Sequence, residues 1–584
     1  MNPFLSAIVA LLGEALRAAA PPGGAAPPEI APGTIEQPPD FALGDYAFPC
    51  FQLARTLHKA PPAIAQDLAA RIRPALAGQA LITGVEAAGP YVNFRVSSAE
   101  MARRVIPAIL EGGYFTANRA AGRARVMIEY SQPNTHKAFH VGHMRNVGLG
   151  DALVRIAAYN GHEVTAANYI GDVGTHIARC LWYYQRHRRE EPPALGKGEW
   201  LGRLYTQATL MIEDAPEEEK ARYEQEVGAV LRQLEAREGE TYRLWQETRA
   251  WSLAAFDEIY QWLRARFDHV FYESGMEAGR QIVEDGLKRG VFVRSQGAVG
   301  VDLEAYQLGF FLALKGDGTT LYATKDLALA RLKFEQFKID ESIYVVGAEQ
   351  TLHFQQVFKV LELLGYEQAR RCRHLPYGLV MLPDGKMSSR AGNVILFSRL
   401  RAEMNAYIFS HYLDAHRGEW PDEEIQETAR RIAVAAIRYG MVKQDPSKTI
   451  VFNLEDWLQS EGDTGTYLCY AFTRIQSVLR LAGREPRADV DYALLTEEPE
   501  KRLIRELHDF NRAVEQAWAT LRPNHVANAL FQLCKEFSRA YTTSPVLKAE
   551  TRALGDARLA LFAATGRLLE RGLDLIGIVP PSRM

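Results

Sequence analysis

The sequence predicts three domains: an α/β domain built on a parallel sheet, an α+β domain before it, and an all-α bundle after it. With 584 residues the chain is too long for a single hydrophobic core. Strand-like and helix-like runs alternate from residue 124 to 184 and resume at residue 342, which is typical of an α/β sheet. After about residue 420 the apolar residues follow helical spacing almost to the end, which favours a helical bundle.

The N-terminal domain is expected to cover residues 1–120. Within it, apolar side chains at helical spacing over residues 4–18 predict an amphipathic helix. Residues 21–39 are dense in proline, glycine and alanine, which predicts a loop.

The central α/β domain is expected over residues 121–420 and the helical bundle over residues 421–584. An insertion at about 185–320 interrupts the central domain. It begins with charge-rich helical sequence over residues 198–266, and two strand-like runs follow around 292–323. The parallel sheet is therefore predicted to be split into two halves.

The composition is that of an ordinary folded protein, with 47% apolar and 24% charged residues. The net charge of -3 indicates no polyanionic partner, so any nucleic-acid surface must be local. No stretch approaches the roughly 20 apolar residues of a membrane span, so no membrane partner is expected. The cysteines lie far apart without a C-x-x-C pair, which argues against a zinc site or a disulfide scaffold and favours a cytoplasmic location.

The first informative motif is S-Q-P-N-T-H-K-A-F-H-V-G-H-M-R-N, residues 131–146, between a predicted strand and a predicted helix. Free backbone N–H groups and the positive dipole end of such a helix start suit a triphosphate. His140 and His143 would add imidazole donors, and Gly142 would let a nucleotide base approach the backbone. Alone, the H-x-G-H pattern is equally well explained by two surface histidines.

The second motif is the turn-rich segment L-P-D-G-K-M-S-S-R-A-G-N-V, residues 382–394. Such a loop can swing over a triphosphate, with Lys386 meeting the charge that develops on pyrophosphate and Ser388 and Ser389 donating hydrogen bonds. By itself this loop is more simply explained as solvated surface.

In this order, on two halves of a split parallel sheet, H-V-G-H and K-M-S-S-R resemble the two signatures of class I aminoacyl-tRNA synthetases. The resemblance implies a Rossmann-type catalytic domain that uses ATP and Mg²⁺, followed by an anticodon-binding bundle. The chemistry agrees, because attack of a carboxylate on the α-phosphate needs alignment and charge stabilisation rather than a nucleophilic side chain.

A pocket for arginine must satisfy a planar cation with five N–H donors, for which carboxylates and a flat aromatic wall are suited. The stretches E-x-S-x-P-N, Y-x-T-x-D and Q-x-L-H supply such residues and resemble the arginine and ATP pocket of arginyl-tRNA synthetases. The resemblance implies that arginine is bound by Glu129, Ser131, Asn134, Tyr322, Asp326 and Gln350. It implies that ATP is bound by His140, His143, His353, Lys386 and Met387.

Within this set the resemblance implies that Asp326 and Glu129 neutralise the guanidinium or the α-amino group, while Tyr322 packs against the arginine side chain. Which carboxylate takes which role stays open. Taken singly, each residue has an ordinary explanation: a strand-end ion pair for Glu129, a helix N-cap for Asp326 and a core aromatic for Tyr322.

The lysines depart from the family pattern. Many arginyl enzymes lack the first lysine of the second motif and carry a lysine just before H-x-G-H, whereas this sequence has both Lys137 and Lys386. How the two divide phosphate binding stays open. The expected catalytic set is Lys137, His140, Gly142, His143, Lys386, Ser388 and Ser389.

Two regions resemble the tRNA-contacting parts of the same family. G-P-Y-V-N-F-R-V is similar to its N-terminal domain, so Tyr91, Asn93 and Phe94 are expected to contact an unpaired tRNA base. A buried strand with an inward Phe94 is an equally good explanation. The C-terminal segments resemble the anticodon-binding bundle, which implies contacts from Tyr541 and Met584.

The resemblances together imply an enzyme that ligates L-arginine to tRNA(Arg) through arginyl-adenylate and releases AMP and pyrophosphate. A monomer is expected, and no metal-ligating residues are predicted. One alternative is a class I synthetase for another amino acid, or a simpler nucleotidylyltransferase, which would not need the two flanking domains. The other is an inactive RNA-binding paralogue, against which the intact motifs count.

Overall fold

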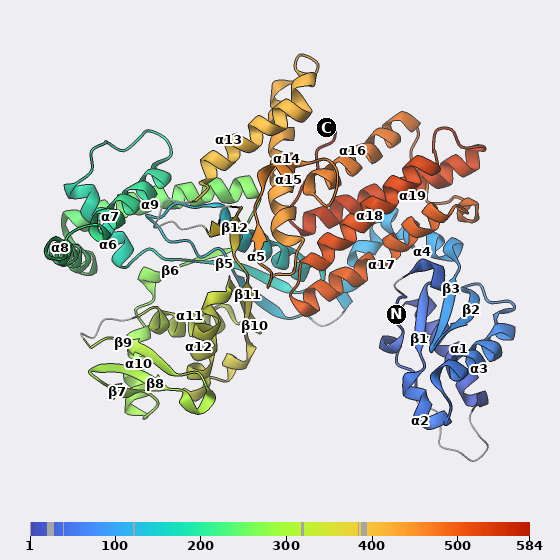
Figure 1. Cartoon of the computed structure of the whole chain (residues 1–584), viewed down its shortest axis with the longest axis horizontal. Helices are drawn as coiled ribbons and strands as arrows, with labels where there is room; N and C mark the ends of the chain where they lie inside the picture. The colour runs from blue at the N-terminus through green and yellow to red at the C-terminus, as the bar shows by residue number, and fades with distance from the viewer. Residues whose placement is uncertain are drawn as a thin grey trace. The chain divides into compact units, whose positions relative to one another are not determined.

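The computed structural model describes residues 2–19, 29–38, 40–120, 123–316, 321–383, 385–386 and 394–584 (Figure 1). Contacts divide the chain into two compact units. The first unit comprises Met1–Tyr114, Ala482–His508 and Arg539–Ala564. The second unit comprises Phe115–Leu481, Asp509–Ser538 and Thr565–Met584.

The first unit contains a three-stranded antiparallel sheet with the strand order β1-β3-β2. Its elements are β1 (Tyr46–Pro49), α2 (Ala54–Leu57), α3 (Pro61–Ile72), β2 (Ile82–Ala88), β3 (Tyr91–Val96) and α4 (Ser98–Glu111), preceded by α1 (Pro3–Ala19). Helix α1 packs against α3 and β2 and buries Phe4, Ile8 and Leu12, which confirms the predicted amphipathic helix. The predicted loop over 21–39 lies partly outside the described residues.

Segments from the C-terminal third of the chain complete this first unit. Arg505 forms an ion pair with Asp45 at 2.5 Å, and Arg558 forms one with Glu500 at 2.7 Å. The unit therefore differs from the continuous domain 1–120 expected from sequence, because interactions this distant in the chain leave no local pattern.

The second unit is built on a five-stranded sheet with the order β11-β10-β4-β5-β6, and all neighbouring strands are parallel. The strands are β4 (Arg125–Glu129), β5 (Glu163–Ile170), β6 (His269–Tyr272), β10 (Glu341–Gly347) and β11 (Cys372–Tyr377). Residues 342–345 are buried without alternation, as expected for a parallel sheet covered on both faces. The predicted parallel sheet is thereby confirmed.

The chain order along this sheet reverses between β4 and β10, and ligands bind at such switch points in open α/β sheets. Helix α5 (Val141–Tyr159) covers one face, where Gly150 passes so close to the Tyr130 ring that a Cβ atom would lie 2.2 Å from it. Helices α11 (Tyr322–Phe337) and α12 (Thr351–Leu363) pack on the other face.

The insertion consists of two separate parts. Between β5 and β6 stand α6 (Thr175–Arg186), α7 (Lys197–Glu213), α8 (Glu217–Glu235) and α9 (Gly239–Leu263). Between β6 and β10 stand α10 (Gly279–Lys288) and an antiparallel sheet of β7 (Val293–Ser295), β8 (Ala298–Asp302) and β9 (Phe310–Leu314). The single insertion expected at 185–320 is thus divided by β6, which is too short at four residues to give a periodic signal.

The C-terminal third is helical, which confirms the predicted bundle. Its helices are α13 (Phe397–Ile408), α14 (Asp422–Val442), α15 (Leu454–Leu458), α16 (Gly465–Ala482), α17 (Glu498–Thr520), α18 (Asn524–Thr543) and α19 (Arg552–Leu575). A small sheet of β12 (Val380–Leu382), β13 (Gly385–Lys386) and β14 (Ile450–Val451) was not expected, because strands of two or three residues carry no pattern. Among the helices of the described ranges, none has the length and apolarity required to cross a membrane.

Candidate active site

Polar side chains gather at the carboxyl ends of the parallel strands, on the face beneath α11. Glu129 ends β4 and is level with Tyr344 of β10 and Ala167 of β5. Side chains alternate along a strand, so Tyr169, two residues beyond Ala167, points to this same face. Glu273 follows β6 directly and contacts α11. These strand ends form the floor of a candidate site at the switch point.

Glu129 lies beside a buried lysine of α11. The Nζ atom of Lys333 is 2.5 Å from Oε2 of Glu129 and 3.8 Å from the centroid of the Tyr344 ring. The other carboxylate oxygen of Glu129 accepts a hydrogen bond from Gln132 at 3.1 Å. Unpaired burial of either charge would cost several kcal/mol. The contact with Lys333 therefore compensates the charge of Glu129 within the protein.

Asp326 has a different kind of partner. It is half-buried in α11, just after the first turn, and its Oδ2 atom lies 2.6 Å from Nε2 of His353 on α12. Gln350 is exposed in the turn between β10 and α12. Asp326 is therefore paired with a histidine, whereas Glu129 is paired with a lysine.

Two carboxylates near this site were not predicted from the sequence. Glu273 pairs with Lys325 at 2.7 Å, and burial raises its pKa while Lys325 lowers it. Asp172 pairs with Arg249 at 2.8 Å and accepts a hydrogen bond from the backbone N–H of Ser274. Asp172 lies two residues beyond the end of β5, and Glu273 follows a strand that is too short to show a periodic pattern.

The loop that joins β4 to α5 follows an unusual backbone path. Ser131, Gln132 and His136 have φ angles of 79°, 44° and 61°, a region that costs side-chain-bearing residues about 1–3 kcal/mol each. The backbone N–H of Ser131 donates to Asn146 at 2.7 Å, and that of Gln132 donates to Asn168 at 3.1 Å. Packing and hydrogen bonds therefore hold this loop in a conformation it would not adopt alone.

Two predicted arginine-binding residues lie in the same loop. The Oγ atom of Ser131 is buried and hydrogen-bonded to the hydroxyl of Tyr260 at 2.7 Å. Asn134 forms a parallel bridge with Gly171, where a Cβ atom would lie 2.3 Å from Oδ1 of Asn134 and 3.5 Å from Oε2 of Glu273. A glycine at position 171 is therefore required for Asn134 and Glu273 to lie close together.

His140 and His143 stand together at the start of α5. The backbone N–H of Gly142 donates to Nδ1 of His140, the backbone N–H of His140 donates to Nδ1 of His143, and the two ring centroids are 3.9 Å apart. Burial lowers the pKa of His140 to about 4, and burial followed by nearby His140 and Lys137 lowers that of His143 well below its ordinary value. Both rings are neutral at pH 7, and because Nδ1 accepts, Nε2–H is the donor that each presents.

The free N–H groups expected at this helix start are bonded inside the protein instead. Val141 donates to the carbonyl of Ile395 at 3.1 Å, and His143 donates to the carbonyl of His140 at 2.9 Å. His140 also forms an antiparallel bridge with Leu396. The segment that follows the second motif therefore lies against the first, and the helix start offers imidazoles rather than backbone amides.

Much of the second motif lies outside the described residues, including the predicted Met387, Ser388 and Ser389. The backbone of Lys386 belongs to β13, and that of Tyr322 begins α11. In the first motif, the Nζ atom of Lys137 lies 5.1 Å from the centroid of the Tyr205 ring on α7.

The predicted tRNA-contacting residues differ in exposure. In the first unit Phe94 is 0% exposed and Asn93 4%, so both are core residues, as the alternative explanation of a buried strand expected. Tyr91 is half-buried and remains accessible, and Tyr541 is 37% exposed on α18. In the second unit Met584 is half-buried beside Arg583, which is ion-paired with Glu424 at 2.6 Å.

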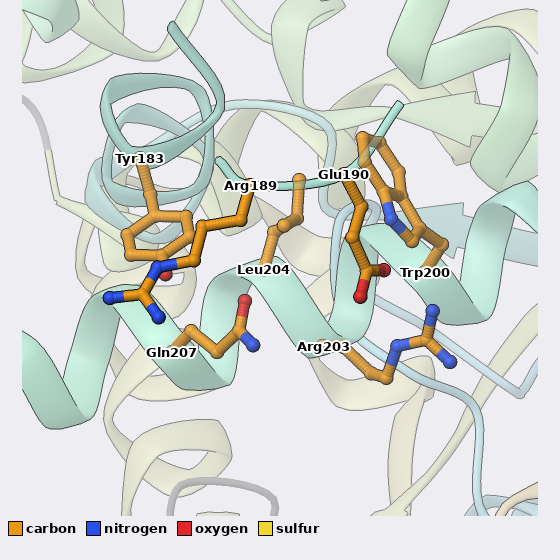
Figure 2. A pocket seen from close by; sticks show the side chains of 7 residues that line it. All are labelled: Tyr183, Arg189, Glu190, Trp200, Arg203, Leu204 and Gln207. Atoms are coloured by element: carbon orange, nitrogen blue, oxygen red, sulfur yellow. The ribbon is translucent and has the colours of Figure 1, made fainter. Parts of the chain in front are cut away.

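A separate hollow of about 540 Å³ opens on the helical insertion (Figure 2). It is lined by Tyr183, Arg189, Glu190, Trp200, Arg203, Leu204 and Gln207. On the opposite side of α7, Gly202 packs against Ala138 so closely that a Cβ atom would lie 2.6 Å from its backbone nitrogen. The hollow therefore faces away from the H-V-G-H loop and includes no residue predicted from the sequence.

Comparison with family models covers most of the chain. Residues 105–454 match the model described as tRNA synthetases class I (R), catalytic domain. Residues 6–96 match the arginyl tRNA synthetase N terminal domain, and residues 468–584 match the DALR anticodon binding domain.

Individual proteins agree with these models. The chain is 43% identical over 578 residues to an arginine–tRNA ligase of Bdellovibrio bacteriovorus, covering 98% of both chains. It is 35% identical to an arginine–tRNA ligase of Clostridium perfringens, covering 93% of this chain and 94% of the relative. Among solved structures, the arginyl-tRNA synthetase of Thermus thermophilus is 27% identical with a TM-score of 0.79, covering 99% of this chain and 100% of that one. One from Plasmodium falciparum, at 18% identity and a TM-score of 0.78 over the full length of both chains, shares the fold.

Proposed function

This chain belongs to the arginyl-tRNA synthetase family, and we propose that it ligates L-arginine to tRNA(Arg) with ATP, through arginyl-adenylate, releasing AMP and pyrophosphate. The observation that carries this proposal is that Glu129 ends β4 at the switch point and the neutral His140–His143 pair begins α5, the next helix along the chain. A triphosphate at the histidines would place its α-phosphate beside an amino acid held by the carboxylates.

The histidines act as neutral donors to the phosphates. Their Nδ1 atoms are occupied, so Nε2–H of His140 and of His143 is available to phosphate oxygens. Lys137 and Lys386 add positive charge toward the leaving pyrophosphate, and Ser388 and Ser389 complete the second motif. These side chains align and neutralise, while the arginine carboxylate itself attacks the α-phosphate.

The two predicted carboxylates take different roles in binding arginine. Asp326, whose partner is a histidine, supplies the charge that neutralises the guanidinium group. Glu129, already paired with Lys333, acts as a hydrogen-bond acceptor held in place by that lysine. Further contacts with arginine come from Ser131, Asn134, Tyr322 and Gln350, and His353 joins the ATP contacts.

The RNA is bound by residues outside the catalytic sheet. Asn93 and Phe94 are buried, so Tyr91 is the residue of the three that remains accessible. Tyr91 stacks on an unpaired tRNA base. Tyr541 and Met584 contact the anticodon region. We expect tRNA to be required for adenylate formation.

Mg²⁺ enters with ATP, because this ion is commonly held by substrate phosphates and one or two carboxylates. Within the described ranges, no group of three or more His, Cys, Asp or Glu side chains is arranged to hold a metal ion.

The enzyme acts as a monomer in the cytoplasm.

The proposal is tested by exchange of labelled pyrophosphate into ATP in the presence of arginine, with and without tRNA(Arg). We expect exchange that depends on arginine and on tRNA. Exchange with arginine alone would refute the tRNA requirement, and no exchange under either condition would refute adenylate formation.

A further inference from the structure

The hydroxyl group of Tyr169 is buried and has no hydrogen-bond partner in the part of the chain that the structure describes. The ring packs into the core under α11, together with Phe271 and Leu329. Leaving a buried hydroxyl unpaired costs about 1–3 kcal/mol, so such a group in a native structure calls for an explanation, for example a ligand that completes it.

This hydroxyl stands among carboxylates on the floor of the candidate site. Burial raises the pKa of Tyr169, and four carboxylates raise it further, in the order Asp326, Glu273, Glu129 and Asp172. These groups come from α11 and from the ends of neighbouring parallel strands. The phenol oxygen therefore lies within electrostatic reach of every carboxylate described at this site.

The charges around Tyr169 leave one carboxylate without a permanent cation. Three are paired with lysine or arginine, in the pairs Glu129–Lys333, Glu273–Lys325 and Asp172–Arg249. The fourth, Asp326, is paired with His353. A guanidinium would supply this fourth carboxylate with the permanent cation that the other three already have.

We propose that Tyr169 is a further arginine-binding residue, whose hydroxyl accepts a hydrogen bond from the guanidinium group and donates its own to a neighbouring carboxylate. This inference rests on the proposed function and adds a residue to its amino-acid pocket. A guanidinium carries five N–H donors in a plane, and the oxygens of Asp326 and Glu129 are partly occupied by partners within the protein. An additional neutral acceptor therefore suits the guanidinium.

The test is the variant Tyr169→Phe, which removes one oxygen atom and leaves the ring that packs in the core. Loss of a hydrogen bond to the charged guanidinium should raise the KM and the calorimetric Kd for arginine roughly tenfold or more. The KM for ATP stays within about twofold, because the phosphates lie at the histidines. A purely structural role would not produce this split between the two substrates.

The matched control is Tyr366→Phe. Tyr366 packs against the same core cluster, and its hydroxyl donates to the carbonyl of Arg331 on α11 at 3.2 Å. This variant also loses a tyrosine hydroxyl beneath α11, but outside the acidic group. We expect its KM for arginine to equal that of the unaltered enzyme.

A second probe identifies which end of arginine the hydroxyl meets. 5-Guanidinovalerate has the guanidinium but lacks the α-ammonium group, and it should compete with arginine. Tyr169→Phe should weaken this inhibitor by the same factor as arginine. An unchanged inhibition constant, or an unchanged KM and Kd for arginine, would overturn the proposal. If the unaltered protein charged no arginine, the proposed function would fail separately, and the calorimetric Kd would still test Tyr169.

Discussion

The Nε2 atom of His353 lies 2.6 Å from the Oδ2 atom of Asp326, and this pair distinguishes Asp326 from the carboxylates around it. Glu129 and Glu273 each contact a lysine on the same helix, α11. One helix thus supplies both the cations that compensate two carboxylates and the carboxylate that remains available. From this pattern we propose Asp326, rather than Glu129, as the counter-charge for the guanidinium.

Replacing Asp326 with asparagine should raise the KM for arginine about 30-fold or more, since a charge-assisted hydrogen bond is lost, at a cost of about 2–3 kcal/mol. The KM for ATP should change little. Steady-state charging kinetics with each substrate varied in turn measure both. Asp340→Asn, which alters an exposed pair with Arg125 at the other end of the sheet, is the control. An unchanged KM for arginine in Asp326→Asn would refute the role.

Replacing Lys333 with methionine should leave the buried Glu129 carboxylate uncompensated and lower the free energy of unfolding by about 3–5 kcal/mol. Denaturant unfolding of the full chain, followed by far-UV circular dichroism, measures this loss. Adding Glu129→Gln to the same chain should restore part of the stability, because no buried charge then remains unpaired. A double variant as unstable as the single one, or less stable, would contradict this account of the pair.

Stability should decrease as the pH falls below about 6.5, partly because of His136. Burial lowers the pKa of His136 to about 3, and both ring nitrogens are hydrogen-bonded, to Thr135 and Thr248. Between these pH values the unfolded chain binds a proton that the folded chain does not. The free energy of unfolding therefore falls by up to about 1.4 kcal/mol per pH unit for this group.

The variant His136→Asn tests that contribution, since asparagine tolerates the positive φ angle at this position. Its absolute stability will fall with the lost hydrogen bonds, so the informative quantity is the slope of stability against pH. We expect the slope between pH 6.5 and pH 4.5 to be shallower by about one proton. A slope equal to that of the unaltered protein would show that His136 does not titrate on unfolding.

Lys137 and Lys386 should share the charge on the phosphates. Lys386→Ala alone should therefore lose less activity than Lys137→Ala combined with Lys386→Ala. Single-turnover formation of arginyl-adenylate isolates the chemical step. Equal losses in the single and double variants would remove the idea of shared duty.

The architecture followed from the sequence because strands such as β4 and helices such as α5 carry continuous apolar patterns. The roles of the site residues stay predictions, but the structure brings Glu129, Asn134 and Asp326 to one acidic floor. Elements of two to four residues, β6, β13 and β14, were missed because they are too short to show a period.

The missed site features depend on contacts between distant residues. Nothing near Glu129 in the sequence indicates that Lys333, more than 200 residues later, compensates its charge. Glu273 lies in no recognisable motif, and the role proposed for Tyr169 depends on carboxylates that belong to other elements. The backbone at the start of α5 pairs with Ile395 and Leu396, which lie beyond the second motif. The sequence left the role of Phe94 undecided between tRNA contact and burial, because a strand pattern alone does not say which face is buried.

The most direct test of the central claim is ATP-dependent attachment of labelled amino acids to a total tRNA pool, with arginine compared with the other nineteen. The acidic pocket around Asp326 predicts charging with arginine alone. Charging with a different amino acid would keep the fold and refute the pocket assignment. An absence of charging with all twenty would contradict the proposed activity and indicate an inactive RNA-binding protein.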